Sequence, residues 1–501
     1  MTIDEAKKIY LDVREKNNAF GLCFYLNGLD IETECAPGGC LDYRSKQLSV
    51  IDSLLYDMNT SENYKKAVET LNENKASLDC DLAHEIEVSA NNMRDLALVP
   101  KDEYLKYSEL VNKAYPAYVK AKAESDYSVF EPYMDKIVKY LRKYVKWVGR
   151  DGKEGYDVLL DKYEPGYTAK DYDKFFDLLR QKLVPFIKKI VAKTPDVPEF
   201  AKKLYPKAGQ VEFCEYLRHV MCFDNEYTGV LESEHPFTTN NGSHDVRITN
   251  HYHEDLMSSA IFSAIHEMGH GLYELQIDDK FEGTNCSGGA SLAMHESQSR
   301  LMENMVGRSL EFWQIHFPKL KEIFKEQLDG VSCEDFYRYA NRVEYSLIRT
   351  EADELTYPIH VMIRYEIEKD LISGKIDAKD IPTVWNKKYF DYMGIRVPND
   401  KNGCLQDMHW SDGSLGYFPT YALGSAYAAQ IYDAMSKDVD IPASVKSGTV
   451  RALEDWLREH LHKYGASKYP KELLKIATGK EFDPNYYIDY LIKKYSDIYG
   501  I

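Results

Sequence analysis

The sequence lacks any run of about 18 consecutive apolar residues, the shortest stretch that suggests a transmembrane helix. Its first eight residues, Met1 to Lys8, are mostly polar and lack the apolar stretch of a secretory signal peptide. We therefore expect a soluble, cytoplasmic protein that has no membrane partner.

Basic residues are outnumbered by acidic ones. The chain has 63 Lys and Arg against 81 Asp and Glu, which gives a formal net charge of −18. Nucleic acids and anionic membrane surfaces both bind proteins through clusters of positive charge. The charge balance therefore argues against nucleic acid and against anionic lipid as partners.

Paired cysteines are also missing. The nine cysteines are scattered along 501 residues, and none forms the CxxC pair of a zinc ribbon. An odd, scattered set in a chain without a signal peptide favours free thiols over a disulfide framework.

Helical periodicity dominates the sequence. Apolar residues recur three and four positions apart, between charged residues, in segments 118–147, 171–193 and 450–499. Glycine and proline gather in a few loops, and no repeat or low-complexity linker divides the chain. The sequence thus predicts a mostly α-helical protein with a single domain over residues 1–501, and two lobes around a groove are compatible with it.

One short segment alternates with the period of a β-strand. Asp245, Arg247 and Thr249 are separated by Val246 and Ile248, so the three polar side chains share one face. This small β element would either line a polar site or form an edge strand with a solvated face, and spacing alone does not separate the two.

Residues 266–270 read His-Glu-Met-Gly-His, the HExxH pattern. On a helix, His266 and His270 lie on one face, about 40° apart, so both imidazoles can bind one metal ion. Glu267 lies at the flank, where a general base for a metal-activated water belongs. A chance match on a surface helix is the alternative. Against it, the same face carries Ser259 and Ser263 rather than the charges of an exposed face.

Two histidines need a third protein ligand, because catalytic zinc usually takes three and leaves one position for water. Glu296 is the candidate: it follows His270 by 26 residues, after a glycine-rich loop. Ser287 is a candidate cap for the helix that carries it. We expect the neighbouring His295 to face away as a structural histidine. The expected cofactor is one Zn²⁺ per chain, although Co²⁺ and Mn²⁺ accept the same ligands.

Six motifs in order make the chain resemble the carboxypeptidase Taq family, also called thermostable carboxypeptidase 1. They are His235-Pro236-Phe237, Asp245-Val246-Arg247-Ile248-Thr249, the HExxH of 266–270, His295-Glu296-Ser297-Gln298, Ile348-Arg349-Thr350-Glu351-Ala352-Asp353 and Gly403-Cys404-Leu405-Gln406-Asp407-Met408-His409-Trp410. An early Pro37-Gly38-Gly39 loop extends the resemblance over nearly the whole chain.

This resemblance implies a large helical metallopeptidase fold around a deep active-site groove. It also implies an enzyme that removes single residues from peptides with a free C-terminus, often as a homodimer. Two rival interpretations remain. One is a helical zinc oligopeptidase that cuts inside peptides, and the other is a non-catalytic peptide- or metal-binding relative.

A carboxypeptidase must also recognise the terminal carboxylate of its substrate. Arg349 is the preferred candidate, because a guanidinium binds a carboxylate through two parallel hydrogen bonds. The structural alternative for Arg349 is an ion pair with Asp353; for Arg247, an ion pair with Asp245 is preferred.

Two further residues are candidates for stabilising the oxyanion. Resemblance to other helical zinc peptidases suggests His409 and Tyr421 for this role. Tyr417 is the alternative to Tyr421. Simple packing within an aromatic loop is an equally good interpretation of these side chains.

Overall fold

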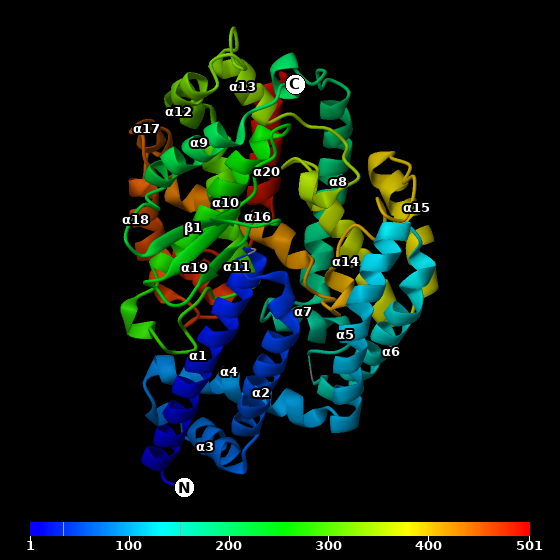
Figure 1. Ribbon diagram of the computed structural model, residues 1–501, viewed down its shortest axis with the longest axis vertical. Coiled ribbons are helices and arrows are strands. Elements are labelled where there is room, and N and C mark those ends of the chain that lie inside the picture. Colours follow the sequence, from blue (N-terminus) through cyan, green and yellow to red (C-terminus); the bar gives the residue numbers. More distant parts are fainter. Residues whose placement is uncertain (34, 151) are drawn as a thin grey trace.

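The computed structural model describes residues 1–33, 35–150 and 152–501. Within these ranges the protein has twenty α-helices and one three-stranded sheet, which confirms the predicted mostly helical fold with a small β element. No helix in the described ranges is long and apolar enough to cross a membrane. The two termini lie at opposite ends of the long axis (Figure 1).

The amino-terminal lobe consists of the first four helices, at the lower end of Figure 1. They are α1 (Ile3–Glu32), α2 (Leu41–Asn59), α3 (Glu62–Glu73) and α4 (Cys80–Leu98). This lobe has a small apolar core of its own, formed by Ala6, Tyr10, Val13, Tyr64, Ala67, Val68, Leu71 and Ile86. The second helix, α2, buries none of its side chains.

The remainder of the chain packs around one large apolar core that extends from Val99 to Ile498. Its first helices are α5 (Lys101–Glu124), α6 (Glu131–Val148), α7 (Tyr156–Tyr163), α8 (Ala169–Val191) and α9 (Lys207–Val220). Long amphipathic helices such as α6 and α8 bury one apolar stripe each, as their periodicity predicts.

The sheet has the strand order β1-β3-β2 and lies against α10. Its strands are β1 (Thr228–Glu232), β2 (Thr238–Asn240) and β3 (Val246–Asn250), with β1 parallel and β2 antiparallel to β3. The predicted strand is therefore the central one, so its interpretation as an edge strand was wrong. The sheet packs with β2 directly beside α10, the helix that carries the HExxH pattern.

Three segments build the site: α10 (Met257–Leu275), α11 (Leu292–Arg300) and the π-helix η6 (Leu301–Gly307) that continues α11. They lie at the centre of the molecule (Figure 1). The remaining helices are α12 (Leu310–Ile323), α13 (Cys333–Ala340), α14 (Tyr357–Ser373), α15 (Ile381–Met393), α16 (Pro419–Met435), α17 (Ile441–Lys446), α18 (Arg451–His460), α19 (Pro470–Thr478) and α20 (Asn485–Tyr499).

Candidate active site

Two glycines bring the helices of the site close together. A Cβ atom on Gly269 of α10 would lie 2.7 Å from the Cα of Ser299 on α11. A Cβ atom on Gly424 of α16 would lie 2.7 Å from the Cβ of Glu296. Each glycine costs about 1 kcal/mol of helix propensity relative to alanine. In return, α11 is held tightly between α10 and α16, with Glu296 facing the two histidines.

The start of α11 is fixed by a cap that sequence analysis placed wrongly. The N-cap is Ser291, whose hydroxyl accepts a hydrogen bond from the Met294 amide. The expected cap, Ser287, instead donates to the carbonyl of Thr284 within the preceding loop. A buried carboxylate, Glu164, accepts hydrogen bonds from the Ser291 hydroxyl and from the Ala293 amide. The first turn of α11 is thus anchored from the end of α7.

His266, His270 and Glu296 converge. One ligand atom from each lies within 4.8 Å of the others, a spacing suitable for a shared metal ion. The Nε2 atoms of His266 and His270 are 3.7 and 3.5 Å from Oε2 of Glu296. Two imidazole nitrogens and one carboxylate oxygen are the donor set of many catalytic zinc sites. The donor chemistry therefore fits the metal that the sequence predicts.

The opposite nitrogen of each imidazole is occupied by a protein partner. Nδ1 of His266 lies 2.9 Å from Glu303, and Nδ1 of His270 lies 2.6 Å from Nδ1 of His295. His295 in turn contacts Glu274 through Nε2, at 2.6 Å. These contacts fix both rings with Nε2 towards Glu296. His295 is a structural histidine, as expected, since both of its ring nitrogens have protein partners. It does not leave the site, however, because its ring packs between His270 and Glu274.

The pKa shifts of His270 and Glu296 favour the protonation states that bind a cation. Burial lowers the pKa of His270 to about 3, so its imidazole is neutral at neutral pH. Burial opposes ionisation of Glu296, but Arg300 and His266 outweigh it and hold the pKa of this carboxyl well below its usual range. Arg300 donates to Oε1 of Glu296 at 2.7 Å, which leaves Oε2 facing the histidines.

Glu267 is buried and held by a residue that sequence analysis missed. The Thr238 hydroxyl lies 2.5 Å from its Oε2 and 2.9 Å from its carbonyl oxygen. Burial raises the pKa of Glu267 above its ordinary value, and the hydrogen bond from Thr238 opposes that rise. Thr238 directly follows the His235-Pro236-Phe237 motif, which was the available signal.

A second cluster contains two arginines that share one carboxylate, and we call Arg349, Arg364 and Asp407 the clamp. Arg349 donates to Oδ1 of Asp407 through Nε and Nη2, at 3.1 and 2.9 Å, and Arg364 donates to Oδ2 at 2.6 Å. Arg349 also donates to the Tyr357 hydroxyl at 3.0 Å. Its ion-pair partner is therefore Asp407 and not Asp353. With two guanidinium groups and one carboxylate, the clamp carries one excess positive charge.

Asp353 has a local structural role. Its carboxylate accepts hydrogen bonds from the amides of Glu344, Leu355 and Thr356. It therefore organises the turn before α14. Arg247 on β3 forms the expected ion pair, at 2.6 Å, with Asp245, which directly precedes the strand.

His409, Tyr421 and Tyr417 lie beside Arg349. Nε2 of His409 is 3.4 Å from the Tyr421 hydroxyl, and the Arg349 guanidinium lies 4.9 Å from the centre of the Tyr421 ring. The Tyr417 ring is 5.3 Å from both His409 and Tyr421. Burial lowers the pKa of His409 to about 4, so its ring is neutral at neutral pH.

The Tyr357 ring connects the two clusters. Its hydroxyl accepts from Arg349, while the Arg300 guanidinium lies 4.4 Å from its centre. Arg300 itself binds Glu296. The sequence-predicted residues of both clusters are thus brought into one continuous site.

Comparisons with known proteins agree over almost the whole chain. The profile of the family described as "Carboxypeptidase Taq (M32) metallopeptidase" matches residues 26–495. Carboxypeptidase 1 of Bacillus subtilis is 37% identical over 100% of both chains. Thermostable carboxypeptidase 1 of Pyrococcus furiosus is 37% identical over 93% of this chain and 94% of that protein.

A solved structure gives the same result. The crystal structure of the M32 carboxypeptidase from Deinococcus radiodurans superposes with a TM-score of 0.94 at 32% identity, covering 99% of this chain and 100% of the other. Both the sequence and the fold match along their full length. The chain belongs to the carboxypeptidase Taq (M32) family and is a metallocarboxypeptidase, a hydrolase of peptide bonds.

Proposed function

We propose that this enzyme releases single residues from peptides with a free C-terminus, with His266, His270 and Glu296 as metal ligands and Glu267 as general base. The observation that carries the proposal is the convergence of the two Nε2 atoms on Oε2 of Glu296, at 3.7 and 3.5 Å. The proposed metal is zinc, one ion per chain, because it prefers this mixture of nitrogen and oxygen ligands. Co²⁺ and Mn²⁺ remain chemically acceptable.

A bound ion would polarise the scissile carbonyl and acidify a water molecule. The protein's own groups then move the protons. Glu267 takes a proton from the attacking water and delivers it to the departing amine. Thr238 supports this role, because its hydroxyl holds Oε2 of Glu267 in one position.

Arg349 is proposed to bind the substrate's terminal carboxylate. The support is the excess positive charge that Arg349 and Arg364 leave over Asp407, which an incoming carboxylate would neutralise. Hydrogen bonds to charged groups contribute roughly 1.5–3 kcal/mol each. Such a contact would fix the C-terminus and thereby select the last peptide bond.

His409 and Tyr421 are proposed as donors to the developing oxyanion. A neutral His409 ring and a protonated Tyr421 hydroxyl can each donate one hydrogen bond. Burial raises the pKa of Tyr421 well above its ordinary value, so the hydroxyl keeps its proton. Tyr417 is the alternative donor, since its ring lies 5.3 Å from His409.

The proposal is tested by digesting one peptide in two forms with the metal-loaded enzyme and measuring the products by mass spectrometry over time. The form with a free C-terminus should shorten one residue at a time. The amidated form should react about tenfold to a hundredfold more slowly, because it lacks the charge that Arg349 binds. Equal rates, or internal fragments, would favour an oligopeptidase.

Two further proposals concern assembly and compartment. All nine cysteines are free thiols, which supports a reducing compartment such as the cytoplasm. A homodimer is proposed from the family resemblance, and α2 offers apolar side chains for such an interface: Leu41, Tyr43, Val50 and Leu54 are all exposed. Light scattering at working concentration would measure the mass directly.

A further inference from the structure

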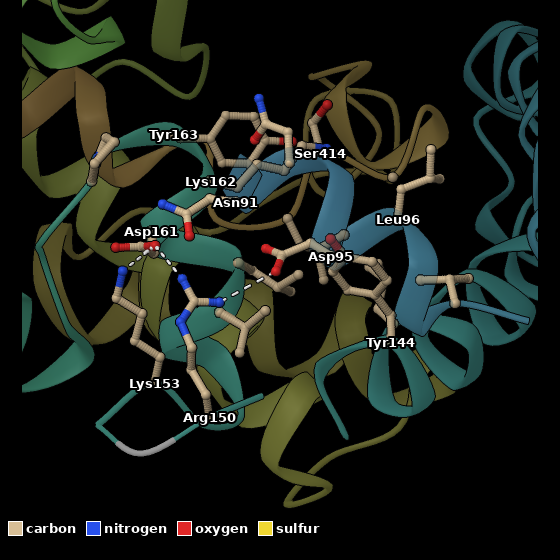
Figure 2. A pocket seen from close by; sticks show the side chains of 18 of the residues that line it. Asn91, Asp95, Leu96, Tyr144, Arg150, Lys153, Asp161, Lys162, Tyr163 and Ser414 are labelled. Carbon is tan, nitrogen blue, oxygen red and sulfur yellow. Dashed lines mark hydrogen bonds and ion pairs between the residues drawn. The ribbon is translucent and has the colours of Figure 1, made fainter. Parts of the chain in front are cut away.

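A cavity lies apart from the metal candidates, where α4 and α5 meet α6 and α7 (Figure 2). Its volume is about 930 Å³, and none of the proposed metal ligands or of the clamp residues lines it. Pockets of roughly 300–1,000 Å³ with apolar walls and a few polar groups are typical small-molecule sites.

The walls are aromatic and aliphatic. Tyrosines line much of the cavity, and two of them, Tyr107 and Tyr140, stack with their ring centres 3.8 Å apart. The buried residues Leu141, Leu159 and Leu415 also line the cavity. A planar, apolar group would find complementary surfaces here.

Four of the charged residues that line the cavity neutralise one another. Figure 2 shows Arg150 between Asp95 and Asp161, at 3.4 and 3.9 Å, and Lys153 against Asp161 at 2.5 Å. The two basic and two acidic side chains have no net charge together, so they do not favour a charged ligand.

One pair of opposite charges is not joined. Lys162 and Asp412 both line the cavity, and among the described residues Lys162 has no carboxylate within 4.0 Å. The two groups are still close enough for Asp412 to oppose the fall that burial causes in the pKa of Lys162. Both residues are exposed, so the cavity presents a solvated ammonium and a solvated carboxylate that do not form an ion pair with each other.

We propose that this cavity binds a free amino acid with an aromatic side chain. The ligand's carboxylate would contact Lys162, its ammonium would contact Asp412, and its ring would lie against the tyrosine wall. A zwitterion fits because it carries an anionic and a cationic group on one carbon atom, one for each side chain, whereas a simple anion or cation carries only one.

The position of the cavity relates this ligand to the reaction. Tyr163, which lines the cavity, packs on Tyr417 with their ring centres 5.3 Å apart. The next residue, Glu164, anchors the helix that carries Glu296. Free amino acids are also what the proposed reaction releases. This link to catalysis rests on the proposed function, whereas binding itself does not.

The test is calorimetric titration of the metal-loaded enzyme with L-phenylalanine, alongside N-acetyl-L-phenylalanine and L-phenylalanine amide, each of which lacks one charge. The Arg349→Ala enzyme is titrated in parallel to distinguish binding in the cavity from binding in the active site. We expect one phenylalanine bound in the Arg349→Ala enzyme, with both analogues about tenfold weaker or worse.

Variants locate the ligand. Lys162→Met should weaken binding about tenfold or more, while Lys146→Met, which removes an exposed lysine outside the cavity, should not change it. Leu96→Trp at the rim should block the space by bulk. Absence of binding, binding that is unchanged in both Lys162→Met and Leu96→Trp, or binding that Arg349→Ala abolishes would overturn the proposal.

Discussion

The metal half of the site and its clamp half carry opposite excess charges. The metal half comprises four carboxylates, Glu267, Glu274, Glu296 and Glu303, against two guanidinium groups, Arg300 and Arg308. The clamp half comprises two guanidinium groups, Arg349 and Arg364, against the single carboxylate of Asp407. Counted over these carboxylates and guanidinium groups alone, the first half has two excess negative charges and the second half one excess positive charge.

This difference indicates what each half is built to receive. A divalent cation would neutralise the excess of the metal half, and a peptide carboxylate would neutralise that of the clamp half. Burial in a low-dielectric interior makes uncompensated charge costly, so both excesses favour the proposed occupants. Mutations in the two halves should therefore fail in different ways.

The largest effect is expected in the metal half. Glu267→Gln removes the proposed base but no ligand, so metal content should stay near that of the wild type. Turnover should fall about 10²–10⁴-fold, the usual contribution of general base catalysis. Rates are measured on enzyme whose metal content has been determined. A metal-loaded variant with near-normal turnover would exclude the role.

The clamp half should lose recognition instead. Arg349→Ala should lower kcat/KM on free peptides about tenfold to over a hundredfold and leave amidated peptides little changed. Arg349→Lys should recover little, since a point charge does not reproduce the planar fork. Wild type and Arg349→Ala are each assayed on free and amidated peptides. This comparison shows whether the mutation and the amidation remove the same interaction. Additive losses would contradict the clamp.

A smaller effect is expected from the outer contacts of the metal half. His295→Ala removes the partner of His270 Nδ1 and should weaken metal binding about 10–100-fold, measured by competition with a chelator. His219→Ala, which alters an exposed histidine paired with Asp224, serves as the control. Unchanged affinity in His295→Ala would mean that the ring does not orient the ligand.

The smallest expected effect is on the pH dependence of folding stability. It should be similar in both halves, because each half is supported by one buried carboxylate. Glu164 anchors α11, and Glu368 accepts from Trp410 and Gly416, on either side of the loop after His409. Burial raises the pKa of each to about 7. A carboxyl whose folded-state pKa is raised stabilises less as pH increases, here between about 4.5 and 7.

Chemical denaturation at a series of pH values measures this contribution. Glu164→Gln and Glu368→Gln should each lose part of the decline in unfolding free energy between about pH 4.5 and 7. The two variants should do so by similar amounts, since burial is the main cause of both shifts. A decline as steep as in the wild type would contradict the pKa shifts.

The sequence allowed prediction of the parts that local geometry determines. The four-residue spacing of His266 and His270 places both rings on one helical face in any α-helix. Contacts between distant segments were harder. Asp353 was the alternative partner considered for Arg349, yet the observed partner is Asp407, 58 residues away in the sequence. Thr238 reaches Glu267 only because β2 packs on α10.

The direction of the His295 side chain on α11 could not be predicted from the sequence either. Neighbouring side chains on a helix diverge by about 100°, so His295 was expected to leave the site. The close approach of α10, allowed by Gly269, brings His270 and Glu274 within reach of its ring. Only the three-dimensional crossing of the two helices determines this contact.

The π-helix η6 makes the metal half sensitive to chain length. Each i→i+5 turn holds one residue more than an α-helical turn, and Glu303 contacts His266 from within this wider winding. Deleting one residue there would let the segment rewind as α-helix, which turns further per residue than a π-helix, and would change the direction in which Glu303 points. Glu303 would then leave His266, while Glu296, which lies before the π-helix, would stay. The contact between Glu303 and His266 therefore depends on the number of residues in segment 301–307 as well as on the side chain at position 303.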